Sequence, residues 1–216
     1  PAEAYAWLNS ALPQGEIEQA TFLWRGGFQP YGNAGQTMQL AAELQNVELD
    51  YQANWPAASI ERAAFRLSDA EIDIWAPRSR VAELPLSDTA VGIRIHPDAV
   101  TFTMKSENNS SPPVFLSGLR KLPALNVAGS LMNDLTLTGE SGVNADLFLG
   151  FDLRDVGNTL DIDFSADFDD TAVTSQFLDM QADDVSGPVS YRHGAGFKSA
   201  GLTASLWGRP LRVVID

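Results

Sequence analysis

The stretch Leu160–Phe168, LDIDFSADF, alternates strictly between apolar and polar side chains. Ile162 and Phe164 represent its apolar positions, and Asp161 and Asp163 its polar ones. Because successive side chains of a β-strand point to opposite faces, this pattern predicts a strand with one apolar face and one acidic face. The acidic face must lie in water, since burying unpaired carboxylates is costly. What covers the apolar face is therefore the question on which the fold and the function depend.

The same alternation recurs along most of the chain. The runs that show it are Met38–Leu44, Val47–Tyr51, Ile72–Ile74, Val91–Ile95, Val100–Met104, Leu135–Leu137, Leu147–Leu153 and Leu202–Leu206. Turn-forming residues separate many of them, as at His96–Asp98, Gly194–Gly196 and Gly208–Pro210. Strands of about 7–12 residues joined by short turns form hairpins, so we predict an all-β fold with a mostly antiparallel sheet.

Two segments have helical signals instead. Residues 2–13 carry apolar side chains at helical spacing and stop at Pro13. Residues 111–122 begin with Ser111 and Pro112-Pro113, which suit a helix start, and end before Pro123. We predict two short helices there and strand for nearly everything else.

Composition excludes several classes of protein. With 14 basic and 28 acidic residues the net charge is −14, which argues against nucleic acid and against docking on anionic lipid headgroups. The absence of cysteine excludes disulfides, thiol catalysis and cysteine-ligated zinc. No apolar run approaches the ~20 residues of a membrane span. Since the chain begins at Pro1 without a signal peptide, we expect it to be one segment of a longer chain.

A search for catalytic residues gives no enzyme signature. Both histidines, His96 and His193, fall in predicted turns, and the common nucleophile, metalloprotease and phosphate-loop motifs do not occur. Asp167, Asp169 and Asp170 are acidic enough for calcium but lack the spacing and the glycine of an EF-hand loop. We expect no enzymatic activity, no metal and no cofactor. A pair of carboxylates that meet in space and cleave a glycosidic bond stays open as an alternative.

Three stretches carry a resemblance to a known family. The segment WLNSALPQGEIEQATFLWRGGF contains a helix that ends in the turn Leu12-Pro13-x-Gly15, followed by a strand that ends at Arg25-Gly26. The segment PPVFLSGLRKLPAL follows mid-chain, and GPVSYRHGAGFKSAGLTASLWGRPLRVVI closes the chain. In this order the segments resemble the YhdP proteins of the AsmA-like superfamily.

The resemblance implies both a fold and a function. The implied fold is a long, twisted antiparallel sheet curled into a trough, here one elongated β-groove segment over residues 1–216 with a sub-boundary near 105–124. Such proteins are anchored in the inner membrane of Gram-negative bacteria, cross the periplasm and are thought to carry phospholipid to the outer membrane. The implied partners are phospholipid and neighbouring segments of the same longer chain. Membrane contact is expected only through parts of the parent chain that lie outside this sequence.

The resemblance also implies a set of lipid-binding residues along the trough. The residues predicted to line it are Leu40, Leu49, Ile72, Ile93, Phe102, Leu149, Ile162 and Phe164. If the trough is open to water, a charge such as Phe164→Asp should leave the protein folded and stop lipid binding. The composition fits a closed β-sandwich with a structural role equally well. In that alternative the same eight residues are ordinary core.

Overall fold

The computed structural model describes residues 10–26, 37–50, 54–122 and 129–216. Twelve strands form one sheet. The strands are β1 (Gln14–Arg25), β2 (Thr37–Leu49), β3 (Ala58–Ser68), β4 (Glu71–Val81), β5 (Leu84–Ile95), β6 (Val100–Ser110), β7 (Leu135–Thr138), β8 (Val143–Asp152), β9 (Asp161–Ser175), β10 (Met180–Arg192), β11 (Gly196–Leu206) and β12 (Arg209–Ile215). The helices are α2 (Pro112–Arg120), α3 (Gly129–Asp134) and α4 (Val156–Thr159).

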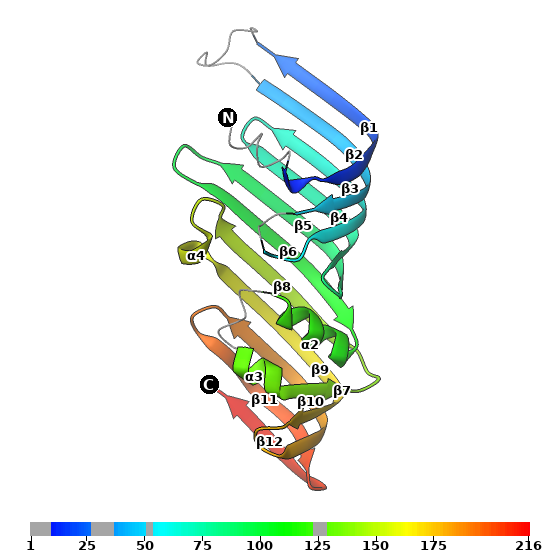
Figure 1. Ribbon diagram of the computed structural model, residues 1–216, viewed down its shortest axis with the longest axis vertical. Coiled ribbons are helices and arrows are strands. Elements are labelled where there is room, and N and C mark those ends of the chain that lie inside the picture. Colours follow the sequence, from blue (N-terminus) through cyan, green and yellow to red (C-terminus); the bar gives the residue numbers. More distant parts are fainter. Residues whose placement is uncertain (1–9, 27–36, 51–53, 123–128) are drawn as a thin grey trace.

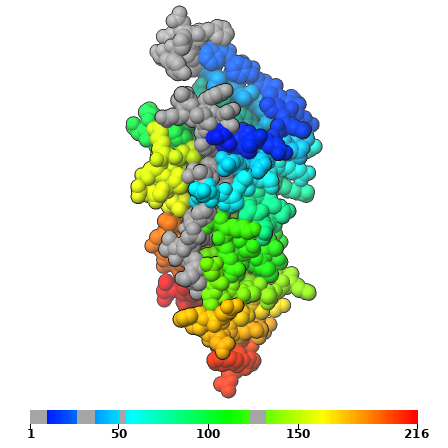
Figure 2. Space-filling view, in the orientation of Figure 1, coloured from blue at the N-terminus to red at the C-terminus, as the bar shows by residue number. Residues whose placement is uncertain are grey.

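The sheet is an antiparallel meander that runs the length of the molecule (Figure 1). Its strand order is β1-β2-β3-β4-β5-β6-β8-β9-β10-β11-β12, so each strand pairs with the next one along the path. β1 lies at one end and β12 at the other, and the sheet does not close on itself within the described residues. The space-filling view shows the same elongated body, with the chain progressing from one end to the other (Figure 2). The prediction of a long antiparallel sheet is confirmed.

One short insertion interrupts the meander. After β6 the chain enters α2, and after α3 the strand β7 pairs with the far end of β9, where Leu137 lies opposite Val173. β8 then returns to pair with both β6 and β9. Because β9 has 15 residues, it is long enough to accept β8 along one half and β7 along the other. The insertion places α2 and α3 in front of the sheet (Figure 1).

The predicted helices have mixed outcomes. The helix predicted at 111–122 is present as α2. Most of the helix predicted at 2–13 lies outside the described residues, although Ser10 and Ala11 are helical. Helices α3 and α4 were not predicted. The alternative of a closed sandwich is wrong, since all twelve strands belong to one open sheet.

The two faces of the sheet differ as the alternation predicts. In β9, Ile162 and Phe164 are buried, whereas Asp161 is exposed and Asp163 is only partly covered. We call the side that carries Ile162 and Phe164 the inner face and the opposite side the outer face. Several strands contain an irregular residue with positive φ, such as Asn46 in β2. The apolar residues on both sides of it still lie on the inner face. An extra residue of this kind corrects the side-chain phase within a strand.

Candidate functional site

The inner face carries apolar residues that line up across the strands. In antiparallel pairing, residues directly opposite each other lie on the same face. One such row crosses seven strands through Phe22, Leu40, Leu67, Ile72, Ile93, Phe102 and Phe151, each the register partner of the next. At about 4.8 Å between neighbouring strands, this row is about 29 Å long. The apolar surface therefore runs along the long axis of the sheet rather than along any single strand.

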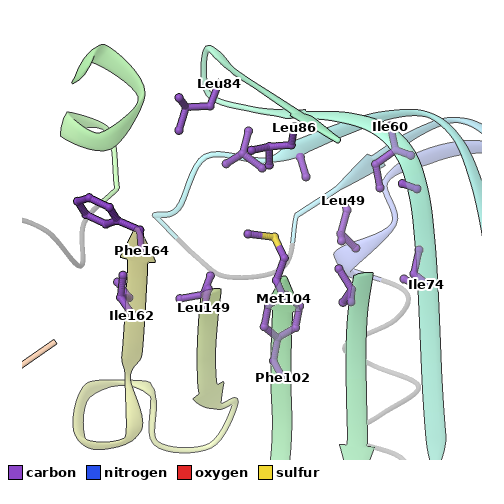
Figure 3. Close-up of a cluster of buried hydrophobic side chains, with 14 of the residues drawn as sticks. Leu49, Ile60, Ile74, Leu84, Leu86, Phe102, Met104, Leu149, Ile162 and Phe164 are labelled. Atoms are coloured by element: carbon purple, nitrogen blue, oxygen red, sulfur yellow. The ribbon is translucent and has the colours of Figure 1, made fainter. Parts of the chain in front are cut away.

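A second row lies beside the first. It passes through Ala20, Ala42, Phe65, Ile74, Val91, Met104, Leu149 and Ile162. Figure 3 shows Met104, Phe102, Leu149 and Ile162 projecting from neighbouring strands into one shared cluster. From Ala42 onward every member of this row is buried. Together the two rows form a continuous apolar strip over the first eight strands of the path.

All eight residues predicted to line the trough lie on the inner face. Leu40, Ile72, Ile93 and Phe102 share the first row, and Leu149 and Ile162 share the second. Phe164 lies next to Ile162 in a row with Leu147 and Tyr191, and Leu49 lies near the opposite ends of the strands, beside Ala58. Seven of the eight are buried and Leu40 is half-buried. The structure thus brings six of them into two adjacent rows, and Leu49 joins the same buried cluster outside these rows (Figure 3).

Helix α2 covers the part of the inner face between β5 and β9. The ring of Phe115 meets the ring of Phe164 edge-on, with centroids 6.1 Å apart, and meets Phe168 in the same way. Gly118 lies directly on Leu84 of β5. Outside the helix, Trp55 packs against Phe151 at the end of the first row, at 6.1 Å. In this conformation the inner face is therefore a filled apolar layer.

The inner face also carries a chain of hydroxyl groups that sequence reasoning missed. Thr89 Oγ1 lies 2.8 Å from both Ser79 Oγ and Ser106 Oγ, and Ser106 Oγ donates a hydrogen bond to the carbonyl oxygen of Ser87 at 3.0 Å. Thr89 and Ser106 are buried. The positive φ of Asp88 marks an extra residue in β5 that turns Thr89 inward. A small polar side chain inside an alternating run gives no sign of such a shift, so the sequence offered no usable signal.

The outer face carries exposed ion pairs. Arg94 and Arg66 bind the Asp73 carboxylate from two sides at 2.6 and 3.1 Å. The hydrogen bond from Arg94 is the main cause of a lowered pKa at Asp73, with Arg66 acting in the same direction against partial burial. Asp163, in the alternating stretch Leu160–Phe168, pairs with Arg192 at 2.8 Å. The carboxylate face of β9 therefore lies on the water side of the sheet, as predicted.

The described residues offer little catalytic or metal-binding chemistry. None of their His, Cys, Asp and Glu side chains gathers in a group of three or more that could hold a metal ion. His96 and His193 both follow strand ends, in turns as predicted. His193 is partly covered, and its Nδ1 atom is buried without a hydrogen-bond partner. No helix in the described part of the chain has the length and apolar character needed to cross a membrane.

A comparison with known protein families identifies the family of this chain. The family model described as YhdP protein matches residues 1–216, the whole sequence. The chain belongs to the YhdP family. No curated protein and no solved structure matches it significantly. Membership in the YhdP family confirms the resemblance identified from the three quoted stretches, and within the AsmA-like superfamily it fits the open antiparallel sheet described above.

Proposed function

We propose that the inner face holds the acyl chains of phospholipid, and that this YhdP-family segment forms part of a path carrying phospholipid between the inner and outer membranes. The observation that carries the proposal is the pair of adjacent apolar rows, which continue over the first eight strands of a sheet that remains open. A structural core needs burial but does not need apolar rows of this length along the molecular axis. Family membership supports the same conclusion.

The two apolar rows can bind an acyl chain without fixing it in one position. Burying one CH₂ group is worth about 0.8 kcal/mol, so a tail of about 16 carbons gains on the order of ten kcal/mol before ordering costs. A tail that shifts from Ile72 and Ile93 to Phe102 exchanges one apolar contact for another. Movement along the rows therefore loses little of this energy. No nucleophile, base or metal takes part, and we propose that the segment acts without catalysis.

Family membership, rather than the geometry, supports our proposals for location and partners. We propose that the parent protein crosses the periplasm from an inner-membrane anchor, and that neighbouring segments of the same chain extend the path. The outer face suits this location because its charged residues, such as Asp73 and Arg94, interact well with water. Contact with either membrane is assigned to other parts of the parent protein.

Site-specific photo-crosslinking tests the proposal. A benzophenone amino acid at Leu40 would lie on the inner face, at a side chain that is only half-buried. The same amino acid at Gln39, the exposed neighbour on the outer face of β2, is the matched control. After purification from a Gram-negative host, mass spectrometry should find phospholipid attached at position 40 and not at 39. Absence of lipid at both positions, together with lipid-free organic extracts, would contradict the proposal.

One observation favours a second candidate, a structural β-domain of the cell envelope without a ligand. The apolar cavity lined by Leu84, Leu119, Leu147 and Phe164 has a volume of only about 40 Å³. A conformation this full is what a purely structural domain would have. The crosslinking experiment separates the two candidates, because a permanently filled core cannot place phospholipid next to residue 40.

A further inference from the structure

Helix α2 occupies the inner face beside the second apolar row, between Leu84 of β5 and Phe164 of β9. Phe115 is buried against Phe164 and Phe168 of β9. At the other side of the helix the contact with Leu84 is so close that a Cβ atom on Gly118 would lie 2.1 Å from Leu84 Cγ. Only a glycine at this position lets the helix backbone rest on β5. The helix is therefore seated directly on the sheet.

The space left under the helix is too small for a lipid. The cavity between α2 and the sheet measures about 40 Å³, whereas sites for small-molecule ligands span about 300–1,000 Å³. Its lining is almost entirely apolar and includes Leu84, Leu86 and Phe164. An acyl chain can lie on this part of the inner face only after α2 has moved away from it.

The polar attachments of α2 lie at its exposed rim. Ser117 Oγ donates a hydrogen bond to Glu83 at 2.8 Å, and Lys121 forms an ion pair with the same carboxylate in the turn between β4 and β5. At the far end Arg120 donates to the carbonyl oxygen of Met132 in α3. Exposed contacts of this kind each contribute little. The buried side of the helix is apolar and includes Phe115, Leu116 and Leu119, so packing against the sheet holds it in place and the polar contacts add to that packing only at its rim.

We propose that α2 is a lid on the inner face: seated, it covers the area beside the second apolar row, from Leu84 of β5 to Phe164 of β9, and lifted, it admits acyl chains there. Glu83 is the latch that holds the lid seated through Ser117 and Lys121. This proposal rests on the proposed function and adds its regulation. It also explains why apolar side chains fill the inner face in this conformation, in which α2 is seated.

An engineered disulfide between lid and sheet tests the proposal. Because the sequence contains no cysteine, the two introduced thiols have no other cysteine in the chain to pair with. Because a Cβ atom on Gly118 would lie 2.1 Å from Leu84 Cγ, the two Cβ atoms of the double variant Leu84→Cys/Gly118→Cys are at most about 3.6 Å apart, at the short end of the 3.5–4.5 Å range of a disulfide. A matched control staple joins Asn109→Cys to Asn144→Cys, register partners on the outer face of β6 and β8 that leave α2 free. Circular dichroism and melting curves establish that both double variants fold.

The readout is uptake of a fluorescent phospholipid from vesicles of phosphatidylethanolamine and phosphatidylglycerol. We expect oxidation of the Leu84→Cys/Gly118→Cys variant to lower bound probe at least tenfold and reduction to restore it, with no redox effect in the Asn109→Cys/Asn144→Cys control. Uptake unchanged by the closed staple, in a protein that binds the probe, would overturn the lid and leave the proposed function intact. Absence of uptake in every form, wild type included, would overturn both.

A latch variant gives a second, independent measurement that needs no disulfide. Glu83→Gln keeps the shape of the side chain and removes the charge that holds Lys121. We expect the rate of probe uptake to rise severalfold relative to wild type. The matched charge control is Asp88→Asn. Asp88 is a nearby exposed residue of β5 that forms no ion pair within the described residues. An equal rate in Glu83→Gln and wild type would mean that Glu83 is not the latch.

Discussion

The ring of Phe115 on α2 meets the ring of Phe164 on β9 edge to face, with centroids 6.1 Å apart and an interplanar angle of 83°. Phe164 also stacks on Tyr191 at 5.6 Å and contacts Phe197 at 6.2 Å. A single side chain thus joins α2 to three neighbouring strands. Because offset and edge-to-face ring pairs add stability beyond their buried area, this cluster is the main apolar attachment of the helix.

This environment changes the expected outcome of Phe164→Asp. On an open trough the variant should fold, but Phe164 is 3% exposed beneath α2, so the new carboxylate would be buried without a partner. We expect a loss of at least about 3 kcal/mol in the free energy of unfolding, measured by urea denaturation. Asp163→Asn is the control on the outer face, where loss of an exposed ion pair should cost less than about 1 kcal/mol. A stably folded Phe164→Asp would mean that water reaches this position and that α2 lifts readily.

The contact between Gly118 and Leu84 predicts an unusual double-mutant cycle. An alanine normally stabilises a helix by up to about 1 kcal/mol relative to glycine. Here we expect Gly118→Ala to destabilise by about 1–3 kcal/mol, because its methyl group would overlap Leu84. Leu84→Ala alone should cost about 2–5 kcal/mol through the cavity it leaves.

The double variant Leu84→Ala/Gly118→Ala should then be more stable than the sum of the single losses predicts, since the new methyl group enters the vacated space. Melting and urea curves of all four proteins give the coupling energy. Additive losses would show that α2 does not rest on Leu84 in solution.

The buried hydroxyl chain should be sensitive to loss of its central member. Thr89→Val keeps the shape of the side chain but leaves the hydroxyl groups of Ser79 and Ser106 without their shared partner. We expect a loss of about 1 kcal/mol in the free energy of unfolding, the low end of the cost of an unsatisfied polar group, because Ser106 keeps its hydrogen bond to Ser87 and Ser79 is only partly buried. Thr89→Ser retains the hydroxyl group and should lose less. Equal stability of Thr89→Val and wild type would indicate that water replaces the missing hydroxyl group.

The alternation in the sequence was enough to assign the faces of individual strands. Ile162, Phe164 and the other predicted lining residues all lie on the inner face, although in β2 Leu40 and Leu49 both point inward only because of the irregular residue Asn46 between them. The face on which a side chain lies was less predictable where a strand contains an extra residue. Thr89 reaches the inner face only because of the irregularity at Asp88, and the sequence has no turn signal there.

The long-range pairing of the inserted segment was beyond sequence reasoning. Leu135 and Leu137 were predicted as strand residues, and β7 confirms them. That β7 pairs with β9 rather than with the neighbouring β8 depends on where α2 and α3 come to rest. The helix α2 itself was predicted, but its seat on Leu84 and Phe164 depends on contacts between residues that are distant in the sequence. Local patterns do not encode such contacts.

The attachment of α2 at Glu83 should depend on pH. Hydrogen bonds from Lys121 and then Ser117 lower the pKa of the Glu83 carboxyl below its ordinary value of 4.5. A carboxyl group whose pKa is lowered by folding stabilises the folded state above its unfolded pKa, and this contribution is lost as the pH falls through the folded pKa. The charged contact should therefore be complete at neutral pH and disappear as the pH falls below about 4.5.

Other carboxyl groups with lowered pKa values, such as Asp73 and Asp134, titrate in the same range, so the measurement is a difference between variants. The melting temperature of Glu83→Gln should be slightly below that of wild type at pH 7, and the gap should close as the pH is lowered towards 3. Lys121→Ala, which removes the partner instead, should show the same closing gap. Added salt should narrow the gap at pH 7, since the pair is exposed and therefore screened. A gap that persists unchanged at pH 3 would mean that packing rather than charge at Glu83 holds the helix to the sheet.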